Sequence, residues 1–247
     1  MRTARVGPRL VAGVAAACLL VVGATTPAGA KSLDLSLCAP TTNTFTLGGN
    51  DFFPMAAGRV SYLRGAEEGQ TIGLRITVLP ETEPLTFGSS TVVARVVEEF
   101  EWNDVDGNGA EDAGEPRIEL ARNYFATTAA GGTVCYFGEA VDNYVDGVVA
   151  DHQGSWRADD PGAAPGIFMP AAPKAGMQFA QESDPGVAED QAAIVGTGDT
   201  TVPAGTFRDT IRVRETNPLD GDKGFKVYAR DVGLVLDAPP QLYSVTG

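Results

Sequence analysis

The sequence predicts an all-β protein, an antiparallel β-sandwich or a curved, partly closed β-barrel that forms a single domain behind an N-terminal signal helix. Strand-like alternation of apolar and polar residues recurs in about a dozen short segments. Turn-forming Gly and Pro residues separate these segments, and no long stretch has the periodicity of a helix. Short strands joined by tight turns are typical of antiparallel sandwiches and barrels.

Residues 1–30 have the order of a secretory signal peptide. Three arginines precede an apolar run, Leu10–Val22, and the small residues Ala28-Gly29-Ala30 follow it. The run is too short to span a bilayer, and no other stretch is long enough to do so. We therefore expect a secreted or cell-envelope protein. The apolar residues that flank Cys18 argue against lipoprotein anchoring at that cysteine.

The remaining chain of about 215 residues fits one large β domain. We expect an N-terminal arm over residues 31–49, the antiparallel β domain over residues 50–237 and a C-terminal tail over residues 238–247. No linker-like stretch divides the β domain. The clearest strand signal is the alternation of apolar Ile72, Leu74, Ile76 and Val78 with other residues. Further strands are expected at residues 91–102, 117–125, 133–137, 148–157, 177–182, 188–195, 207–215, 225–230 and 233–236, with a long surface loop over residues 159–173.

Two cysteines remain after the predicted cleavage, Cys38 and Cys135. An even number of cysteines in an exported chain favours a disulfide bond over two buried thiols. We expect this bond to tie the N-terminal arm to the middle of the β domain.

Residues 104–115 fit the calcium-loop pattern D-x-[DN]-x-[DN]-G-x₅-E at every specified position. Calcium takes roughly six to eight hard oxygen ligands, and Gly109 would allow the sharp turn that brings them together. The predicted Ca²⁺ ligands are the side chains of Asp104, Asp106, Asn108, Asp112 and Glu115 and the carbonyl oxygen of Ala110.

The segments on both sides of this loop predict strands and not the helices of a complete EF-hand. Four of the six residues from Val92 to Val97 are valines, which are β-branched, and Pro116 follows the loop directly. We therefore expect an EF-hand-like calcium loop that joins two strands. The alternative interpretation is an acidic, glycine-rich hairpin loop that is only solvated.

The net charge of the chain limits its partners. Removal of the three signal-peptide arginines changes the net charge from −14 to −17. So acidic a protein repels nucleic acid and anionic lipid, and we expect neither as a partner.

Four motifs stand out in the chain: Tyr136-Phe137-Gly138-Glu139, Gly154-Ser155-Trp156-Arg157-Ala158, Pro165-Gly166-Ile167-Phe168-Met169-Pro170-Ala171 and Val202-Pro203-Ala204-Gly205-Thr206-Phe207. With these motifs the chain resembles an uncharacterised family of exported bacterial all-β proteins. The resemblance covers roughly residues 50–237, implies export and a β fold, and implies no chemistry. Cys135 departs from it by standing where an aromatic residue is expected, and the twelve-residue loop resembles an insertion into a shorter hairpin.

The favoured function is a non-enzymatic, calcium-binding β domain that binds a small ligand or an envelope polymer. No catalytic set is expected, because His152 is the only histidine and no nucleophile elbow surrounds Ser155. One alternative is a calcium-dependent hydrolase acting on polysaccharide or lipid, with acid and base drawn from Glu182, Glu189 and Asp190. Another is an adhesion module whose acidic surface meets a basic partner.

Overall fold

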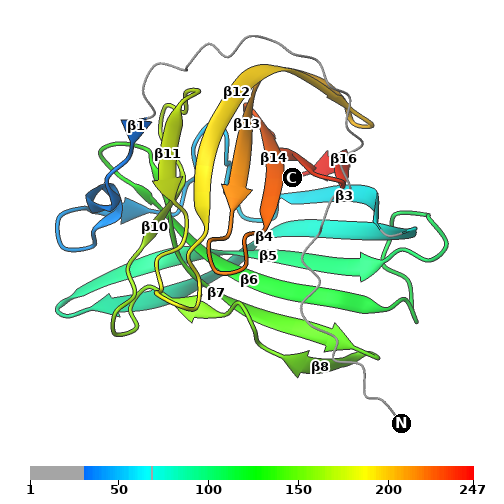
Figure 1. Cartoon of the computed structure of the whole chain (residues 1–247), viewed down its shortest axis with the longest axis horizontal. Coiled ribbons are helices and arrows are strands. Elements are labelled where there is room, and N and C mark those ends of the chain that lie inside the picture. Colours follow the sequence, from blue (N-terminus) through cyan, green and yellow to red (C-terminus); the bar gives the residue numbers. More distant parts are fainter. Residues whose placement is uncertain (1–30, 68) are drawn as a thin grey trace.

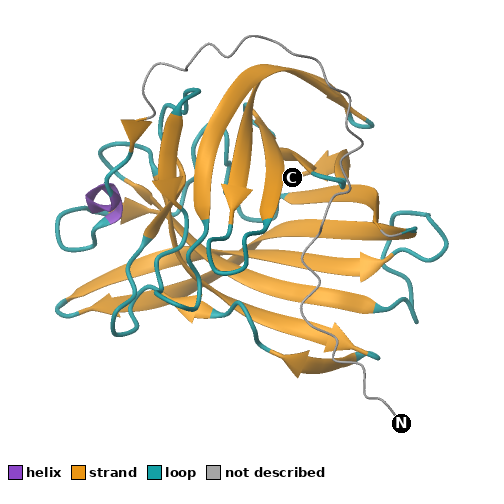
Figure 2. Cartoon of the chain, viewed as in Figure 1, coloured by secondary structure: helices purple, strands orange, loops and turns teal. Residues whose placement is uncertain are grey.

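The computed structural model describes residues 31–67 and 69–247, which form one continuous β sheet that curves back over itself (Figures 1 and 2). The all-β prediction is confirmed. The predicted signal helix and Cys18 lie outside the described residues. Within them the sheet has 16 strands, in the order β1-β11-β12-β13-β14-β15-β16-β3-β4-β5-β6-β7-β10, with β2, β8 and β9 paired beside this path. Only β1 and β11 pair in parallel.

A single short 3-10 helix, η1 (Leu35–Cys38), interrupts the strands of the described chain. The strands are β1 (Lys31–Ser32), β2 (Phe45–Thr46), β3 (Val60–Glu67), β4 (Gln70–Phe87), β5 (Ser90–Asn103), β6 (Arg117–Thr128), β7 (Val134–Val145), β8 (Val148–Asp151), β9 (Trp156–Arg157), β10 (Gly166–Met169), β11 (Met177–Ala180), β12 (Gln191–Val202), β13 (Gly205–Thr216), β14 (Lys223–Ala229), β15 (Gly233–Asp237) and β16 (Gln241–Thr246).

The sheet has two halves that face each other. Strands β3 to β7 form an antiparallel meander, and β12 to β14 arch across it (Figure 1). Strand β16 joins the halves by pairing with β15 on one side and β3 on the other. The opposite edges also meet, because the Ala164 N–H beside β10 donates to the Ser183 carbonyl 2.8 Å away, just after β11. The sheet is therefore a partly closed barrel.

Gly166 allows the two edges to come together. A Cβ atom at this position would lie 1.8 Å from the Gln181 carbonyl oxygen, so any larger residue would force β10 away from the end of β11. The close approach of the two edges thus depends on the absence of a side chain at Gly166.

The hydrophobic core fills the space between the halves. Buried residues alternate with more exposed ones along strands such as β3 and β5, as the period of a half-buried strand requires, whereas β6 and β7 are buried over several consecutive residues. The largest core residues with almost no exposure are Leu63, Leu85, Phe125, Phe137, Ile167, Ile194, Ile211, Tyr228 and Leu242.

Cys38 and Cys135 form the predicted disulfide bond, with 5.7 Å between their Cα atoms. Both cysteines are fully buried. The bond holds η1 against β7, and β2 adds a short pairing with β6 next to it. The N-terminal arm is thereby fixed to the domain in two places.

Two expectations about the chain need correction. Residues 159–173 are not one loop, because β10 lies among them and pairs Gly166 with Tyr136 and Ile167 with Cys135. Burial of Ile167 and Met169 in the core explains this strand. Residues 238–247 are not a free tail either, since they contain β16. The domain limits themselves stay a prediction.

Candidate functional site

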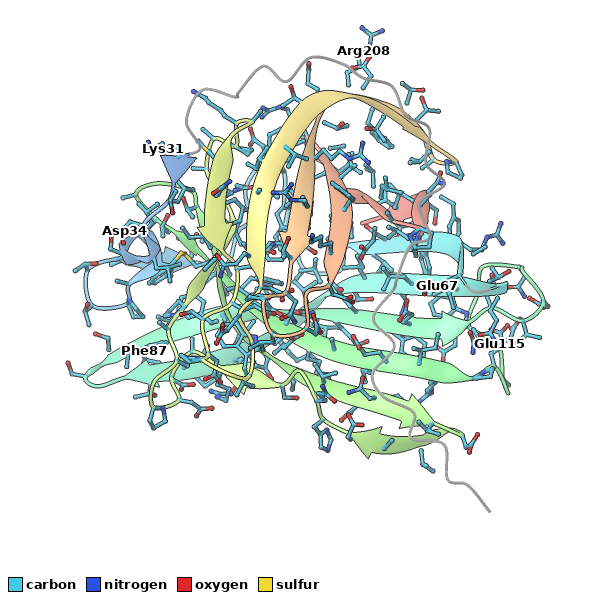
Figure 3. All side chains as sticks on the ribbon, viewed as in Figure 1. Lys31, Asp34, Glu67, Phe87, Glu115 and Arg208 are labelled. Carbon is cyan, nitrogen blue, oxygen red and sulfur yellow. A yellow bond between two sulfur atoms is a disulfide. The ribbon has the colours of Figure 1, made fainter. Side chains whose placement is uncertain are left out.

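The loop between β5 and β6 joins two strands, as the sequence predicts. Backbone hydrogen bonds close its base: Asn103 N–H donates to the Pro116 carbonyl and Asp104 N–H donates to the Thr71 carbonyl, each at 2.9 Å. The loop stands at one end of the meander, where Glu115 lies at the rim of the sheet (Figure 3).

Three of the predicted calcium ligands converge in this loop. Asp104, Asp106 and Glu115 each place one carboxylate oxygen within 4.8 Å of the other two. It is the one such group of His, Cys, Asp or Glu side chains in the described part of the chain. These three acids could hold a metal ion.

The two carboxylate oxygens of Asp104 differ in their surroundings. Oδ2 accepts a hydrogen bond of 3.0 Å from the Gly109 N–H and lies 3.7 Å from the Arg64 guanidinium. Oδ1 is buried and has no hydrogen-bond partner. Only 1% of Asp104 is exposed. A buried anionic oxygen without a partner is costly, and a bound cation would remove that cost.

Glu115 closes the loop from its other end. Its Oε1 accepts from the Val105 N–H at 2.7 Å, and its Oε2 accepts from the Asp112 N–H at 3.0 Å. Each carboxylate oxygen has a further lone pair available. The hydrogen bonds therefore set the position of the carboxylate without using its full capacity to bind a cation.

The other predicted ligands take part in hydrogen bonds within the loop. The Asn108 side-chain nitrogen donates to the carboxylates of Asp106 and Asp112, and its Oδ1 accepts from the Ala110 N–H at 2.6 Å. If the Asn108 side-chain oxygen is to bind a cation, its hydrogen bond from the Ala110 N–H must change. The full ligand set of six residues stays a prediction.

Glu111 belongs to a different group of charges. Its carboxylate lies 3.3 Å from the Arg75 guanidinium and 3.4 Å from that of Arg117. These ion pairs anchor the loop to β4 and β6 and keep Glu111 away from the three converging acids.

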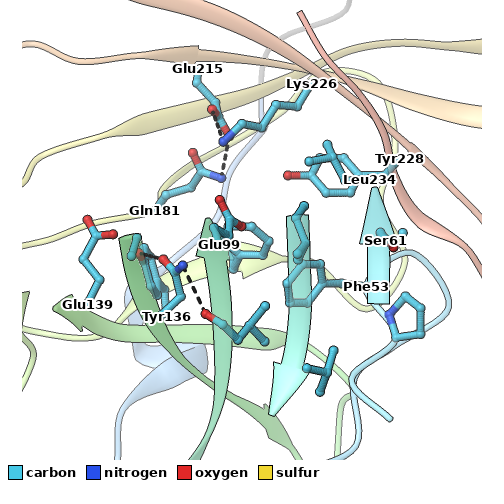
Figure 4. A pocket seen from close by; sticks show the side chains of 18 of the residues that line it. Phe53, Ser61, Glu99, Tyr136, Glu139, Gln181, Glu215, Lys226, Tyr228 and Leu234 are labelled. Atoms are coloured by element: carbon cyan, nitrogen blue, oxygen red, sulfur yellow. Dashed lines mark hydrogen bonds and ion pairs between the residues drawn. The ribbon is translucent and has the colours of Figure 1, made fainter. Parts of the chain in front are cut away.

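A second candidate site lies between the two halves of the sheet and was missed by the sequence analysis. It is a cavity of about 230 Å³. Figure 4 shows Glu99, Glu139, Glu215 and Lys226 around it. Six acidic side chains line the cavity, together with aromatic and aliphatic residues; the acids are Glu99, Glu119, Glu139, Glu182, Asp190 and Glu215.

Burial raises the pKa of most of these acids. It raises the pKa of Glu99 to about 7 and that of Glu182 to about 8. It also raises the pKa of Asp190 to about 6, with Glu215 adding to the effect, and that of Glu139 well above its ordinary value. Removal of a carboxylate from water disfavours its charged form, and neighbouring carboxylates disfavour it further.

Lys226 is the cation inside this group. Its nitrogen lies 3.1 Å from Glu215 and 3.9 Å from Asp237. Burial alone would lower its pKa, yet Asp237 and Glu215 raise that pKa well above the ordinary value. The side-chain amide of Gln181 also donates to Glu215, at 3.1 Å. Glu215 thus has both a cationic and an amide partner.

The acids proposed for hydrolysis do not all meet. Glu182 and Asp190 line the cavity, and the negative charge of Asp190 contributes to the raised pKa of Glu182. Glu189 instead accepts from the Gly186 N–H at 2.7 Å in a surface turn. The sequence contained a signal for the missed acids, because Glu99 and Glu119 stand inside strands where apolar residues otherwise alternate.

His152 and Ser155 both contact the backbone of Val141, and their side chains do not bond to each other. The His152 Nδ1 lies 2.9 Å from a carboxylate oxygen of Asp142, while the Ser155 hydroxyl oxygen accepts from the Val141 N–H at 2.8 Å. Neither contact orients one residue toward the other. The two residues serve as supports for the β7–β8 region.

Comparison with known proteins adds little to this geometry. No family model and no curated protein matches the chain. Among solved structures, a protein from Parabacteroides distasonis ATCC 8503, described provisionally as a lipoprotein, is similar with 15% identity and a TM-score of 0.35. The match covers 80% of this chain and 99% of that one. At this score it indicates no shared function. The described residues include no helix with the length and apolar character needed to cross a membrane.

Proposed function

We propose that this chain is an exported β protein whose β5–β6 loop binds a structural calcium ion, and that it serves as a non-enzymatic binding or envelope-associated module. The observation that carries the proposal is the convergence of Asp104, Asp106 and Glu115 oxygens within 4.8 Å. The buried Asp104 Oδ1, which has no hydrogen-bond partner, adds a reason for a cation at this point.

The donor atoms favour calcium over other ions. All three converging groups are carboxylates, and hard oxygen ligands suit calcium or magnesium, whereas zinc and copper sites usually include His or Cys ligands. Magnesium requires a near-octahedral arrangement and keeps several waters, while calcium accepts a flexible loop with bidentate carboxylates. A twelve-residue loop with the glycine turn at Gly109 meets the calcium requirement.

A bound ion would join β5 to β6. Asp104 follows the last residue of β5, and Glu115 precedes β6 by two residues. Calcium would therefore neutralise acids that repel one another and fix both ends of the loop. This is a stabilising role and requires no reaction.

The experiment is calorimetric titration of chelator-treated protein with calcium chloride, followed by melting with and without the ion. We expect one calcium site and a higher melting temperature, since a ligand at about 100 times its Kd stabilises the fold by about 2.7 kcal/mol. Glu115→Gln and Asp104→Asn should abolish the calorimetric signal. The control is Asp220→Asn, in the turn between β13 and β14, which should bind calcium like the wild type.

Two results would contradict the calcium proposal. One is wild-type protein whose melting temperature and protease resistance across residues 104–116 are the same in calcium and in chelator. The other is a Glu115→Gln variant that binds calcium as tightly as the wild type.

Export is supported by the Cys38–Cys135 disulfide, because such bonds persist in oxidising compartments outside the cytoplasm. Mass spectrometry of protein recovered from the producing cell tests the rest of this proposal. A first residue of Lys31 supports signal cleavage without an anchor. An acylated first residue at Cys18 would show that the chain is a lipoprotein.

One observation favours a second candidate function, a calcium-dependent hydrolase. Glu182 and Asp190 share a cavity wall, and their pKa values, raised by burial to about 8 and about 6, suit an acid and a base. A cavity of about 230 Å³ would admit a small substrate and not a polymer chain. Hydrolysis that is lost in both Glu182→Gln and Asp190→Asn, but not in Glu189→Gln, would establish it.

A further inference from the structure

We propose that the cavity between the two halves of the sheet is a binding site for a small organic cation, an amine carried on a compact apolar body. This site is separate from the calcium loop and does not depend on it.

The first step is the charge balance of the cavity wall. Two basic residues line the cavity, Lys226 and Arg59. Lys226 is paired with Glu215 and Asp237. The Arg59 guanidinium donates to the backbone carbonyls of Asp231 and Val232, at 3.2 and 2.9 Å. Both cations are therefore already committed to other partners.

Five of the lining acids are left without a basic partner. In the part of the chain that the structure describes, no Lys, Arg or His lies within ion-pair distance of them; they are Glu99, Glu119, Glu139, Glu182 and Asp190. Such an excess of buried carboxyl groups is costly, because each must either take up a proton or lose the solvation of its charge. An incoming cation would relieve this cost.

Two observations beyond the number of acids point to a ligand. The Glu99 carboxyl is enclosed by the surrounding strands and is directed into the cavity (Figure 4). It makes no hydrogen bond or ion pair with another described residue. The part of the Glu99 side chain that remains exposed therefore faces the cavity. The Asp190 Oδ1 atom, next to β12 in the other half of the sheet, is also buried and has no hydrogen-bond partner. Both groups could accept hydrogen bonds from an ammonium.

The rest of the wall indicates an apolar body next to the charge. Aromatic and aliphatic side chains complete the lining, among them Phe53, Phe168, Tyr228, Ile76 and Leu234. Aromatic faces attract cations and also pack against apolar groups. The cavity volume of about 230 Å³ limits the ligand to a small molecule.

A metal ion fits this cavity less well than an organic cation. Metal binding needs several ligand atoms close together, and within the described residues only Asp104, Asp106 and Glu115 meet that condition. The six cavity acids are spread around the wall, across β5, β6, β7, β13 and the segment between β11 and β12. An amine with three donors on a bulky body can reach acids placed in this way.

The test is calorimetric titration of calcium-saturated protein with benzylamine, benzyl alcohol and benzoate at neutral pH. These probes share a ring and differ in charge. Benzylamine should bind at least about tenfold more tightly than benzyl alcohol, and benzoate should not bind, because hydrogen bonds to charged groups contribute that much discrimination. The double variant Glu99→Gln with Glu119→Gln should weaken benzylamine binding by about tenfold or more.

The control variant is Glu189→Gln, whose carboxylate lies in a surface turn outside the cavity, and it should bind benzylamine like the wild type. Glu115→Gln should lose calcium and keep benzylamine binding, so failure of one site is distinguishable from failure of the other. Benzylamine binding that is absent, equal to that of benzyl alcohol, or unchanged in the double variant would overturn the proposal. Calcium binding that persists in Glu115→Gln and competes with benzylamine would also overturn it, in favour of a metal site.

Discussion

The Lys226 ammonium nitrogen lies 3.1 Å from the Glu215 carboxylate inside the curved sheet, and the pair connects the neighbouring strands β14 and β13. Asp237, on β15, lies 3.9 Å from the same nitrogen. One lysine thus holds three adjacent strands together on the wall that faces Glu99, Glu119 and Glu139 of the meander. The stability of this half of the sheet should depend on that single positive charge.

We predict that Lys226→Met lowers the free energy of unfolding by about 3 kcal/mol at neutral pH, because it leaves buried carboxylates without their cation. The double variant Lys226→Met with Glu215→Gln should recover part of this loss. Urea unfolding of the three proteins measures both effects. Equal unfolding free energies for wild type and Lys226→Met would show that the ion pair does not stabilise the fold.

The buried acids predict how stability changes with pH. Burial raises the pKa of Glu99 to about 7 and that of Glu101 to about 8, from an ordinary value of 4.5. Between pH 4.5 and these raised values, the folded protein retains protons that the unfolded chain has lost. These groups therefore favour folding less and less as pH rises through that window, and the penalty is complete above about pH 8.

We accordingly expect chelator-treated protein to be more stable toward urea at about pH 5 than at about pH 8. Glu101→Gln should flatten this dependence, since glutamine has no proton to lose. Glu81→Gln, at a solvent-exposed position of β4, serves as the control and should leave the dependence unchanged. A protein whose stability rises steadily from acid to alkaline pH would contradict the assignment.

The fold class and the convergence of Asp104, Asp106 and Glu115 in one loop were predictable because their signals are local. Alternation along residues 71–78 determines which side of one strand is apolar, and the loop pattern at residues 104–115 is contained in twelve consecutive positions. The disulfide was predictable for a different reason: only two cysteines lie outside the predicted signal peptide.

The cavity and β10 were not predictable because both depend on contacts between distant segments. Alternation places Glu99 on one side of β5, but only the arching of β12 to β14 makes that side an interior. Strand β10 has four residues, and its pairing of Ile167 with Cys135 joins positions far apart in the chain. A short apolar triplet beside prolines carries no sign of such a partner.

The glycines of the loop provide a further prediction. Gly109 has φ of +83°, and a Cβ atom there would lie 2.9 Å from the Tyr243 hydroxyl oxygen. Gly107 has φ of +73° with no atom within 4 Å of such a Cβ. An alanine at either position has the same backbone strain, of about 1 kcal/mol, but only Gly109→Ala also displaces the Tyr243 ring.

We expect Gly109→Ala to weaken calcium binding by about tenfold more than Gly107→Ala does, because a shift of the loop separates the ligand oxygens. Adding Tyr243→Ala to Gly109→Ala should restore part of the difference by removing the clash. Calorimetric titration of the four proteins with calcium measures each step. Equal losses for the two single variants would mean that the Tyr243 contact does not position the loop.

The disulfide gives the last prediction. Cys38 and Cys135 are 97 residues apart, so their bond closes a long loop of the unfolded chain. In the chain-entropy model such a bond stabilises the fold by about 4–5 kcal/mol. Cys38→Ser with Cys135→Ser should therefore lower the free energy of urea unfolding by up to about that amount.

The proper comparison is wild-type protein with its disulfide reduced and its thiols kept free, which should unfold at a similar urea concentration. If reduction destabilises the protein much less than the double substitution does, the cost comes from placing serine hydroxyls in the core around β7 and not from the lost cross-link.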